Sequence, residues 1–274
     1  MSAEANPTTP SGGASSEDAP QLLQDAAAPI VHLTLNRPRQ RNALSRELLV
    51  DLLAGLDACA ANAVIRVVVL AANGPVFSAG HDLREIQSSS PAEIEELFAL
   101  CSRVMLRIQE IPQPVIARVH GLATAAGCQL VAACDLAVAA EAATFATPGI
   151  SIGLFCSTPA VPVVRTVGRK RALEMLFTGD AIDARTACDW GLVNRVVPQA
   201  ELDAEVQRLA SKITSASAET VAIGKRAFYR QVGLLERDAY ELASAVMCEN
   251  AATPDAREGI AAFVEKRRAV WRSR

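Results

Sequence analysis

The stretch His120–Asp135 reads HGLATAAGCQLVAACD, and it decides how the rest of the chain is interpreted. The apolar run Val115–Val119 predicts a strand, which leads into a glycine turn at Gly121 and a helix starting near Ala125. The first N–H groups of a helix have no partner within it, and they carry the positive end of its dipole. Small residues there, such as Ala126, would let a polarised oxygen reach these N–H groups.

A second donor would be needed to hold that oxygen from the other side. The loop FSAGHDL, residues 77–83, is the expected source, because Gly80 has no obstructing side chain and the N–H of His81 follows it. Two such donors form an oxyanion hole, and losing one costs about 2.7–4 kcal/mol of transition-state stabilisation. Tight helix packing also selects Ala and Gly, so the spacing by itself leaves both interpretations open.

Composition excludes several classes of partner. The 274 residues are half apolar with a net charge of −3, and no basic stripe points to nucleic acid. Charge, Gly or Pro breaks each apolar run before about 18 residues, so no membrane span is expected. Seven Cys without a C-x-x-C pair predict reduced, buried thiols, and three His without helical spacing give no metal site. The N-terminus lacks a signal pattern and the arginines of a mitochondrial presequence, which predicts a cytoplasmic protein.

Strand and helix patterns alternate up to about residue 200, which predicts an α/β layered core. Ser45 is expected to cap one helix, and Ser90 with Glu93 forms a capping box for another. Strands are expected at 30–35, 64–72, 115–119 and 135–140 and near 191–198, and later helices at 201–214, at 218–248 and from 253 onward. The chain therefore divides into a disordered tail (1–28), an α/β core (29–200) and a helical region (201–274).

Six motifs in order resemble the crotonase superfamily, the enoyl-CoA hydratases and isomerases. They are LNRPRQRNAL (35–44), VFSAGHDLREI (76–86), PVIARVHGLATAAGCQLVAACDLAVAA (114–140), FATPGISIG (145–153), ALEMLFTGDAIDARTACDWGLVNRVVP (172–198) and EGIAAFVEKR (258–267). The resemblance covers roughly residues 29–270. Within the family, GLATAAGCQL with SIGLFCSTP looks most like the subgroup called enoyl-CoA hydratase domain-containing protein 3.

The resemblance implies a spiral of repeated ββα units and a C-terminal helical region that builds homotrimers, often paired into hexamers. It implies acyl-CoA substrates, with no metal and no cofactor other than the CoA that the thioester carries. The two backbone donors map onto His81 and Ala126, although the family often has Gly at the second position.

The resemblance also implies a CoA site along two loops. Arg39, Arg41 and Arg84 are its candidates for phosphate contacts, because a guanidinium combines charge with paired donors. Lys266 matches a lysine that reaches the CoA of a neighbouring subunit, and Phe263 lies near the acyl tunnel. The other implied substrate-binding residues are Ala43, Ser78, Ala79, Gly80, Asp82, Leu83 and Cys156.

Two positions depart from the family pattern. The glutamates that hold and activate water in a hydratase are replaced here by Gln129 and Gly149. One positioned acid–base group contributes about 10²–10⁴-fold, so hydration should be weak or altered. Cys156 is a conceivable nucleophile, with a buried, inert thiol as the favoured alternative.

Four other polar residues lie within these motifs. The imidazole of His81 is expected either near the thioester or in solvent. His120 is expected to organise its turn and Asp135 to be structural, while Asp82 is expected to fix its loop rather than transfer protons.

Three functions follow from these observations. The first is an enzyme of fatty-acid or acyl-CoA metabolism, in its most conventional version an enoyl-CoA hydratase or isomerase of the lyase class, with an atypical site. The second is a non-catalytic acyl-CoA-binding protein, or a subunit that assembles with active relatives. The third, a scaffold that binds no CoA, conflicts with the retained loop motifs at residues 78–82 and 120–127.

Overall fold

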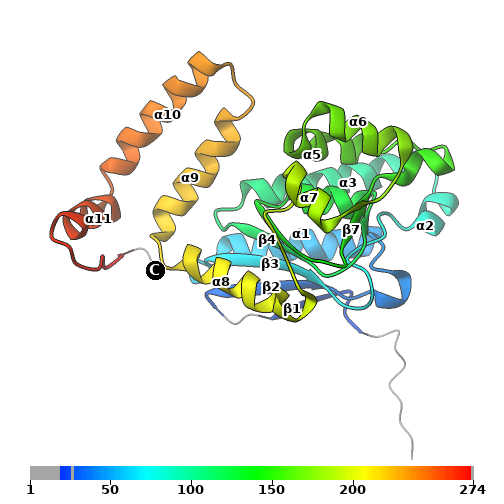
Figure 1. The fold of residues 1–274 in the computed structure, drawn as a ribbon, viewed down its shortest axis with the longest axis horizontal. Coiled ribbons are helices and arrows are strands. Elements are labelled where there is room, and N and C mark those ends of the chain that lie inside the picture. Colours follow the sequence, from blue (N-terminus) through cyan, green and yellow to red (C-terminus); the bar gives the residue numbers. More distant parts are fainter. Residues whose placement is uncertain (1–18, 26–27, 273–274) are drawn as a thin grey trace, which may run out of the picture.

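The computed structural model describes residues 19–25 and 28–272 and shows an α/β core with a helical arm (Figure 1). A six-stranded sheet runs in the order β1-β2-β3-β4-β6-β9, parallel except for the β1–β2 pair. A smaller sheet has the order β5-β7-β8. The strands are β1 (Leu22–Asp25), β2 (Ile30–Leu35), β3 (Val67–Ala72), β4 (Val115–Val119), β5 (Ala123–Thr124), β6 (Leu136–Ala140), β7 (Thr144–Ala146), β8 (Ile182–Asp183) and β9 (Arg195–Val197).

The chain spirals through these two sheets. One turn runs from β4 through β5 to α4, and the next from β6 through β7 to α5. The preceding turn leaves β3 and reaches Ser78, which bridges to Ala123 beside the small sheet. The turn before that leaves β2 and reaches Leu44, which bridges to His81. The predicted spiral of ββα units is thus confirmed, and each turn places its second extended segment next to that of the following turn.

Helices α1 to α8 belong to the core and α9 to α11 form the arm. The core helices are α1 (Arg46–Ala61), α2 (Leu83–Ser88), α3 (Pro91–Glu110), α4 (Ala126–Ala133), α5 (Ser157–Val167), α6 (Arg169–Thr178), α7 (Ala184–Trp190) and α8 (Leu202–Thr214). The arm holds α9 (Ala218–Gln231), α10 (Glu236–Ala251) and α11 (Pro254–Val264), and single 3₁₀ turns are η1 (Pro38–Gln40), η2 (Pro148–Ile152) and η3 (Gln199–Glu201).

Local sequence signals explain where the long helices begin. The Ser45 hydroxyl accepts the Leu48 N–H at 3.3 Å, so α1 starts at its predicted cap. Ser90 and Glu93 form the predicted capping box of α3, in which the Glu93 carboxylate accepts the Ser90 N–H at 2.7 Å.

Both faces of the large sheet are covered. In β2, Val31, Leu33 and Leu35 face the core under α1 and α3, as their alternation predicts. The opposite face is covered by α8, whose Leu202 and Val206 are buried against strand residues. The helical region therefore leaves the core after α8, near residue 217, rather than at residue 201.

Other boundaries also differ from the sequence prediction. Residues 1–18 and 26–27 of the predicted tail lie outside the described residues, but Leu22–Asp25 form β1, which pairs with β2. Leu22 packs against the core, so ordered structure starts before residue 29 because a short apolar segment covers the free edge of β2. The pattern over 218–248 forms two helices, α9 and α10. The strand expected from Val64 starts at Val67.

The arm projects away from the core in Figure 1. Neither α9 nor α10 has a fully buried residue. Large apolar side chains are exposed along the arm: Phe228, Val232, Leu234, Leu235, Tyr240, Met247, Ile260, Phe263 and Val264. No helix within the described part of the chain combines the length and apolar character needed to cross a bilayer.

Candidate active site

The start of α4 is held in an unusual backbone conformation. Ala125, at the N-cap, has φ 51° and ψ −120°, a region that residues with a Cβ rarely adopt. Such a conformation costs about 1–3 kcal/mol and is typical of functional sites. The first bond within the helix runs from the Gln129 N–H to the Ala125 carbonyl at 3.0 Å, so the Ala126 N–H has no acceptor inside α4.

The loop that carries His81 lies directly against this helix start. A Cβ on Gly80 would lie 3.2 Å from the Ala126 nitrogen and 2.9 Å from the Ala125 Cβ. A Cβ on Gly127 would lie 2.4 Å from the Ser78 carbonyl oxygen. Only glycine fits at both contact points, which accounts for the small residues in the two motifs. The structure thus brings together the two segments expected to donate, while their convergence on one oxygen stays a prediction.

Hydrogen bonds fix this loop to the segment before α1. The Ser78 hydroxyl donates to the Asn42 carbonyl at 2.8 Å, and the Leu44 N–H donates to the Gly80 carbonyl at 2.7 Å. The Ala79 N–H donates to the Arg41 carbonyl at 3.0 Å. Residues 41–44 and 78–81, which the family resemblance assigns to one substrate site, therefore lie side by side.

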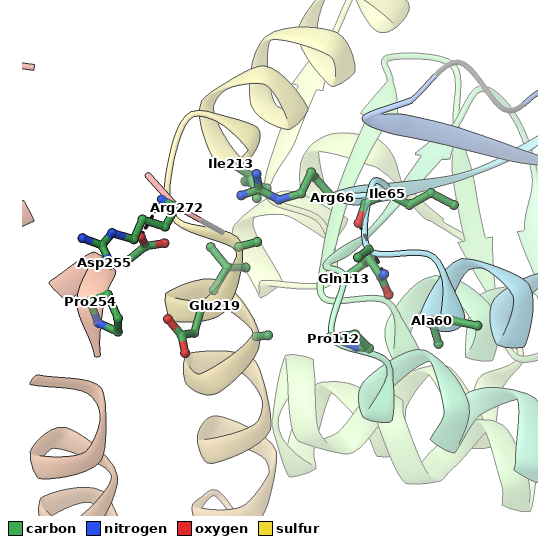
Figure 2. A pocket seen from close by; sticks show the side chains of 15 residues that line it. Ala60, Ile65, Arg66, Pro112, Gln113, Ile213, Glu219, Pro254, Asp255 and Arg272 are labelled. Atoms are coloured by element: carbon green, nitrogen blue, oxygen red, sulfur yellow. Dashed lines mark hydrogen bonds between the residues drawn. The ribbon is translucent and has the colours of Figure 1, made fainter. Parts of the chain in front are cut away.

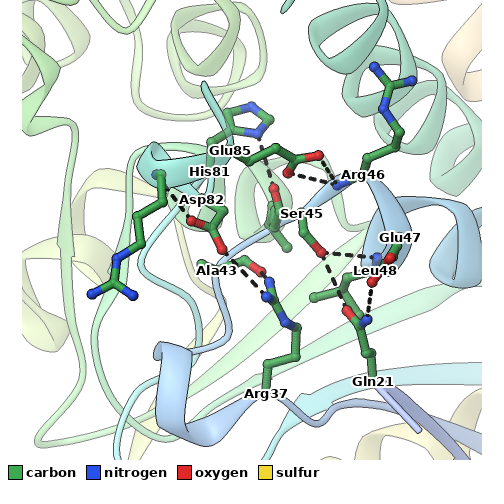
Figure 3. A network of polar contacts seen from close by, with 12 residues as sticks. Gln21, Arg37, Ala43, Ser45, Arg46, Glu47, Leu48, His81, Asp82 and Glu85 are labelled. Atoms are coloured by element: carbon green, nitrogen blue, oxygen red, sulfur yellow. Dashed lines mark hydrogen bonds and ion pairs between the residues drawn. The ribbon is translucent and has the colours of Figure 1, made fainter. Parts of the chain in front are cut away.

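The imidazole of His81 packs inside the protein. Its Nδ1 lies 3.3 Å from the Leu44 carbonyl oxygen (Figure 3), and its ring meets Phe98 edge-on at 5.1 Å. Burial lowers the pKa of His81, with the Leu44 hydrogen bond acting in the opposite direction. The side chain therefore anchors the loop. Of the two orientations expected from the sequence, the one that extends into solvent is not observed.

Asp82 holds the other end of the loop. Its carboxylate caps α2 by accepting the Arg84 N–H at 3.2 Å and pairs with Arg37 at 3.4 Å (Figure 3). Arg37 also donates to the carbonyl of the buried Ala43 at 2.7 Å. Arg37 did not emerge from the sequence analysis, and its Arg-Pro context alone could not have revealed this role. The predicted phosphate contacts Arg39, Arg41 and Arg84 are exposed, as is Leu83.

Two buried side chains near α4 each have one polar atom without a partner in the described structure. Gln129 is 3% exposed, and its Oε1 has no hydrogen-bond partner among the described residues. Thr147 is fully buried, and its Oγ1 is likewise unpaired in the described structure. Thr147 follows β7, whose Ala146 carbonyl accepts the Ala125 N–H at 2.9 Å. No sequence pattern pointed to Thr147, because only the pairing of β5 with β7 places it beside α4.

Gly149, where the resemblance implies a glutamate, is sterically enclosed. A Cβ there would lie 1.9 Å from the Leu154 carbonyl oxygen and 2.8 Å from the Cys156 sulfur. The turn is closed by the Leu154 N–H, which donates to the Gly149 carbonyl at 2.9 Å. Cys156 is 7% exposed, and burial raises the pKa of its thiol, so the thiol stays protonated near neutral pH.

His120 and Asp135 of the opening stretch have contacts within the protein. His120 Nε2 lies 2.8 Å from the Gly74 carbonyl oxygen, which belongs to the loop after β3 and not to the turn of His120 itself. The Asp135 carboxylate accepts from Lys225 Nζ at 2.6 Å, from the Tyr229 hydroxyl at 2.8 Å and from the Val115 N–H at 2.7 Å. This network ties α9 to the core.

Other cavities lie away from this site. One of about 630 Å³ has Arg66, Gln113, Glu219 and Asp255 in its wall, where the core meets the arm (Figure 2). Another of about 500 Å³ is lined by Asp135, Lys225 and Tyr229 among others. Within residues 19–25 and 28–272, no three His, Cys, Asp or Glu side chains gather as a metal site would require.

Two predicted residues are separated from the rest. Phe263 is 85% exposed on α11, and Lys266 is exposed just beyond that helix. Figure 1 shows α11 at the far end of the molecule from α2, so these residues do not join the His81 loop within one chain.

Known proteins resemble this chain over most of its length. A family model described as enoyl-CoA hydratase/isomerase matches residues 25–274. The mitochondrial enoyl-CoA hydratase domain-containing protein 3 of Mus musculus is 48% identical over 265 residues, which cover 95% of this chain and 87% of the relative. The Homo sapiens protein of that name is 49% identical over 243 residues, covering 88% and 80% respectively.

These relatives correct one expectation. The proteins of this subgroup from mouse, rat, human, Xenopus laevis and Danio rerio are all named mitochondrial. The predicted cytoplasmic location is therefore wrong. The prediction was based on the lack of an arginine-rich pattern in the N-terminal residues. That observation is outweighed by 45–49% identity to proteins that are named mitochondrial.

Solved structures agree with the sequence matches. The crystal structure of an enoyl-CoA hydratase from Mycobacterium smegmatis has a TM-score of 0.91 and 52% identity, covering 92% of this chain and 99% of that one. The human domain-containing protein 3 structure has a TM-score of 0.90 and 47% identity, covering 92% and 100%. The predicted fold and subgroup resemblance are confirmed, and the chain belongs to the enoyl-CoA hydratase/isomerase family.

Proposed function

We propose that this protein binds acyl-CoA thioesters and polarises the thioester carbonyl between the N–H groups of His81 and Ala126. The carrying observation is the close approach at Gly80, where a Cβ would lie 3.2 Å from the Ala126 nitrogen. The strained backbone of Ala125 and the Ala126 N–H, which has no acceptor inside α4, support the same role. Negative charge that develops on the carbonyl oxygen would be stabilised by both donors.

The CoA moiety would lie along the two joined segments, 39–44 and 78–84. Exposed guanidinium groups on Arg39, Arg41 and Arg84 suit its phosphates. Lys266 and Phe263 would act on the site of a neighbouring subunit in a homotrimer or a hexamer of paired trimers. The exposed apolar side chains of the arm support such an assembly.

The reaction would belong to fatty-acid or acyl-CoA metabolism, with hydration weak. Gln129 has no proton to exchange near neutral pH, and residue 149 has no room for an acid. The enclosed Gly149 also favours a second candidate, a non-catalytic acyl-CoA-binding protein or partner subunit of active relatives.

Infrared spectroscopy of a bound ligand tests the carbonyl contact directly. Butyryl-CoA carrying a ¹³C label at the thioester carbonyl should show a lower C=O stretching frequency when bound than in water, because two N–H groups polarise it. Calorimetry should show that butyryl-CoA binds about 10-fold more tightly than the S-butyl-CoA thioether, which lacks the carbonyl, since each hydrogen bond contributes about 0.5–1.5 kcal/mol. Equal affinity and an unshifted frequency would contradict the proposal.

A steady-state assay with crotonyl-CoA separates the two candidates. Turnover near that of ordinary hydratases that is lost in Gln129→Ala would show that hydration persists. Clear binding without turnover across a panel of acyl-CoA thioesters would favour the non-catalytic role.

A further inference from the structure

A second candidate site lies between the core and the arm, in the cavity of about 630 Å³ (Figure 2). Its wall is built from the end of α1, the loops before β3 and after α3, the turn between α8 and α9, the start of α11 and Arg272. Cavities of about 300–1,000 Å³ with a few polar groups among apolar side chains are typical of small-molecule sites. None of its lining residues belongs to segments 39–44 or 78–84 or to α4, so this cavity is separate from the proposed thioester site.

Most of the cavity wall is apolar. Ala60, Pro112, Ile213 and Ala222 are among its lining residues, and they come from both the core and the arm. A hydrocarbon chain that covers them would remove apolar surface from water, which is favourable. The main part of a fitting ligand is therefore aliphatic.

One polar atom in this wall lacks a partner. Gln113 is 5% exposed, and its Nε2 donates to the carbonyls of Cys59 at 2.8 Å and Ile65 at 3.3 Å. Since two carbonyls need this nitrogen, the orientation of the amide is fixed and Oε1 is its free end. Oε1 has no hydrogen-bond partner in the described structure, and a carbonyl oxygen can only accept. A ligand that completes this contact must therefore carry an O–H or N–H donor.

Arg66 supplies a positive charge to the same wall, one residue after Ile65. Its Nη2 donates to the Ala216 carbonyl at 2.7 Å, so the side chain reaches from the core to the turn before α9 (Figure 2). Burial lowers the pKa of Arg66, while the charge of Asp255 acts in the opposite direction. A guanidinium has five N–H donors, so Arg66 keeps donors beyond the one bound to Ala216. A partly desolvated guanidinium favours an anion beside it, and its planar donors match a carboxylate.

The Asp255 carboxylate is held by other donors. Asp255 is 1% exposed, and it accepts from the Ser217 hydroxyl at 2.7 Å and from the Arg272 N–H at 2.7 Å. These contacts fix the acid at the junction of α9, α11 and the end of the chain. Asp255 therefore shapes the cavity wall, and the charge of Arg66 is left for a ligand.

We propose that this cavity binds an aliphatic hydroxy acid. The carboxylate pairs with Arg66, the hydroxyl donates to Gln113 Oε1, and the hydrocarbon chain covers the apolar wall. The two polar contacts start from neighbouring points, since the Gln113 amide lies on the Ile65 carbonyl. The hydroxyl therefore lies close to the carboxylate, as in a 3-hydroxy acid. This inference goes beyond the proposed function and does not depend on it.

The bound acid contacts both parts of the molecule at once. Gln113 and Ile65 belong to the core, whereas Ala222 and Pro254 belong to the arm. Because the ligand binds only when these parts are folded together, it stabilises their junction by mass action. Amide hydrogen exchange in residues 213–222 should therefore slow when the acid binds.

The test is calorimetry of the full chain with 3-hydroxydecanoate and with decanoate, which lacks only the hydroxyl. The hydroxy acid should bind about 3- to 10-fold more tightly, as expected for one hydrogen bond to a neutral acceptor. Gln113→Met should remove this preference, because it removes the acceptor.

A pair of arginine variants tests the charge. Arg66→Gln should weaken binding of both acids about 10- to 100-fold, as expected for the loss of a charge-assisted contact. Arg165→Gln is the matched control, because Arg165 is exposed on α5 and also donates to a carbonyl, that of Val161 at 2.7 Å. This control should bind both acids like the wild type.

Hydrogen exchange identifies where the acid binds. Slower exchange in residues 213–222 that is unchanged by saturating CoA would support the proposal. Slower exchange confined to residues 78–84 and 125–129, or competition with CoA, would overturn it and leave the proposed function intact. Equal affinity for the two acids would also overturn it, as would an equal loss in Arg66→Gln and Arg165→Gln. Melting temperatures without ligand identify any variant that fails to fold, and the comparison of the two acids in the wild type does not depend on the variants.

Discussion

Buried polar groups are fully paired at one end of the α4 segment and partly unpaired at the other. At the end of α4, the Asp135 carboxylate accepts from Lys225, Tyr229 and the Val115 N–H. Lys225 in turn donates to the carbonyls of Ile108 at 2.6 Å and Gln113 at 2.8 Å. At the start of α4, by contrast, Gln129 Oε1 is buried without a partner in the described structure.

This difference distinguishes a network that stabilises the fold from a site that can bind a ligand. The Asp135 carboxylate has three donors, two of them from α9, so this network stabilises the attachment of the arm. Around the start of α4, the unpaired buried atoms and the strained backbone of Ala125 lower the stability of the folded protein. Proteins keep such features where a bound molecule completes them. Substitutions at the two ends should therefore change stability with opposite signs.

The largest effect on stability is expected in the Asp135 network. Lys225→Met should lower the free energy of unfolding by about 3–5 kcal/mol, because it leaves the Asp135 carboxylate buried without its cation. The Lys225 side chain is 6% exposed and that of Asp135 14%, so water cannot readily replace the lost partner. Urea denaturation monitored by circular dichroism would measure the change.

A double variant serves as the control. Asp135→Asn with Lys225→Met removes both charges and should cost clearly less than Lys225→Met alone. An equal or larger loss in the double variant would show that packing of the lysine chain, and not the unpaired charge, accounts for the effect.

A smaller loss of stability is expected at Gly149, which is sterically enclosed. Gly149→Ala should lower the free energy of unfolding by about 1–3 kcal/mol, since its methyl group would overlap the Leu154 carbonyl oxygen at 1.9 Å. Gly224→Ala on α9 meets no atom within 4 Å and should be neutral or stabilising. Thermal unfolding of both variants makes the comparison, and equal melting temperatures would contradict the enclosed turn.

The contrast between the two ends also shows what the sequence could predict. Local signals such as the cap at Ser45, the capping box at Ser90 and the alternation in β2 predicted the elements well. Family motifs predicted which loops meet. The unpaired Thr147 hydroxyl and the closure over Gly149 could not be predicted, because they depend on the pairing of β5 with β7 and on how the turn after Gly149 folds back over it. The partners of Asp135 lie 90 and 94 residues away, which no local pattern encodes.

Near the start of α4, removing an unpaired buried polar atom should stabilise the protein. Thr147→Val replaces an unpaired buried hydroxyl by a methyl group of similar size, so the free energy of unfolding should rise by about 1 kcal/mol. Ser78→Ala is the matched contrast, because that buried hydroxyl donates to the Asn42 carbonyl at 2.8 Å, and its loss should be destabilising. Chemical denaturation without ligand gives both values. A destabilised Thr147→Val would mean that the hydroxyl already has a partner.

The smallest effect is a dependence on pH at His81. Burial lowers its pKa below the ordinary value of 6.5, so the folded state binds this proton less readily than the unfolded state. Its contribution to stability is therefore complete above pH 6.5 and is lost as the pH falls through the folded pKa. His120, whose pKa is also lowered by burial, adds a loss of the same sign. His81→Phe should keep the His120 part and lose less stability than the wild type between about pH 7 and pH 5. Identical slopes in the two proteins would show that His81 becomes protonated without disturbing its loop, and the imidazole would then not be an anchor of the candidate site.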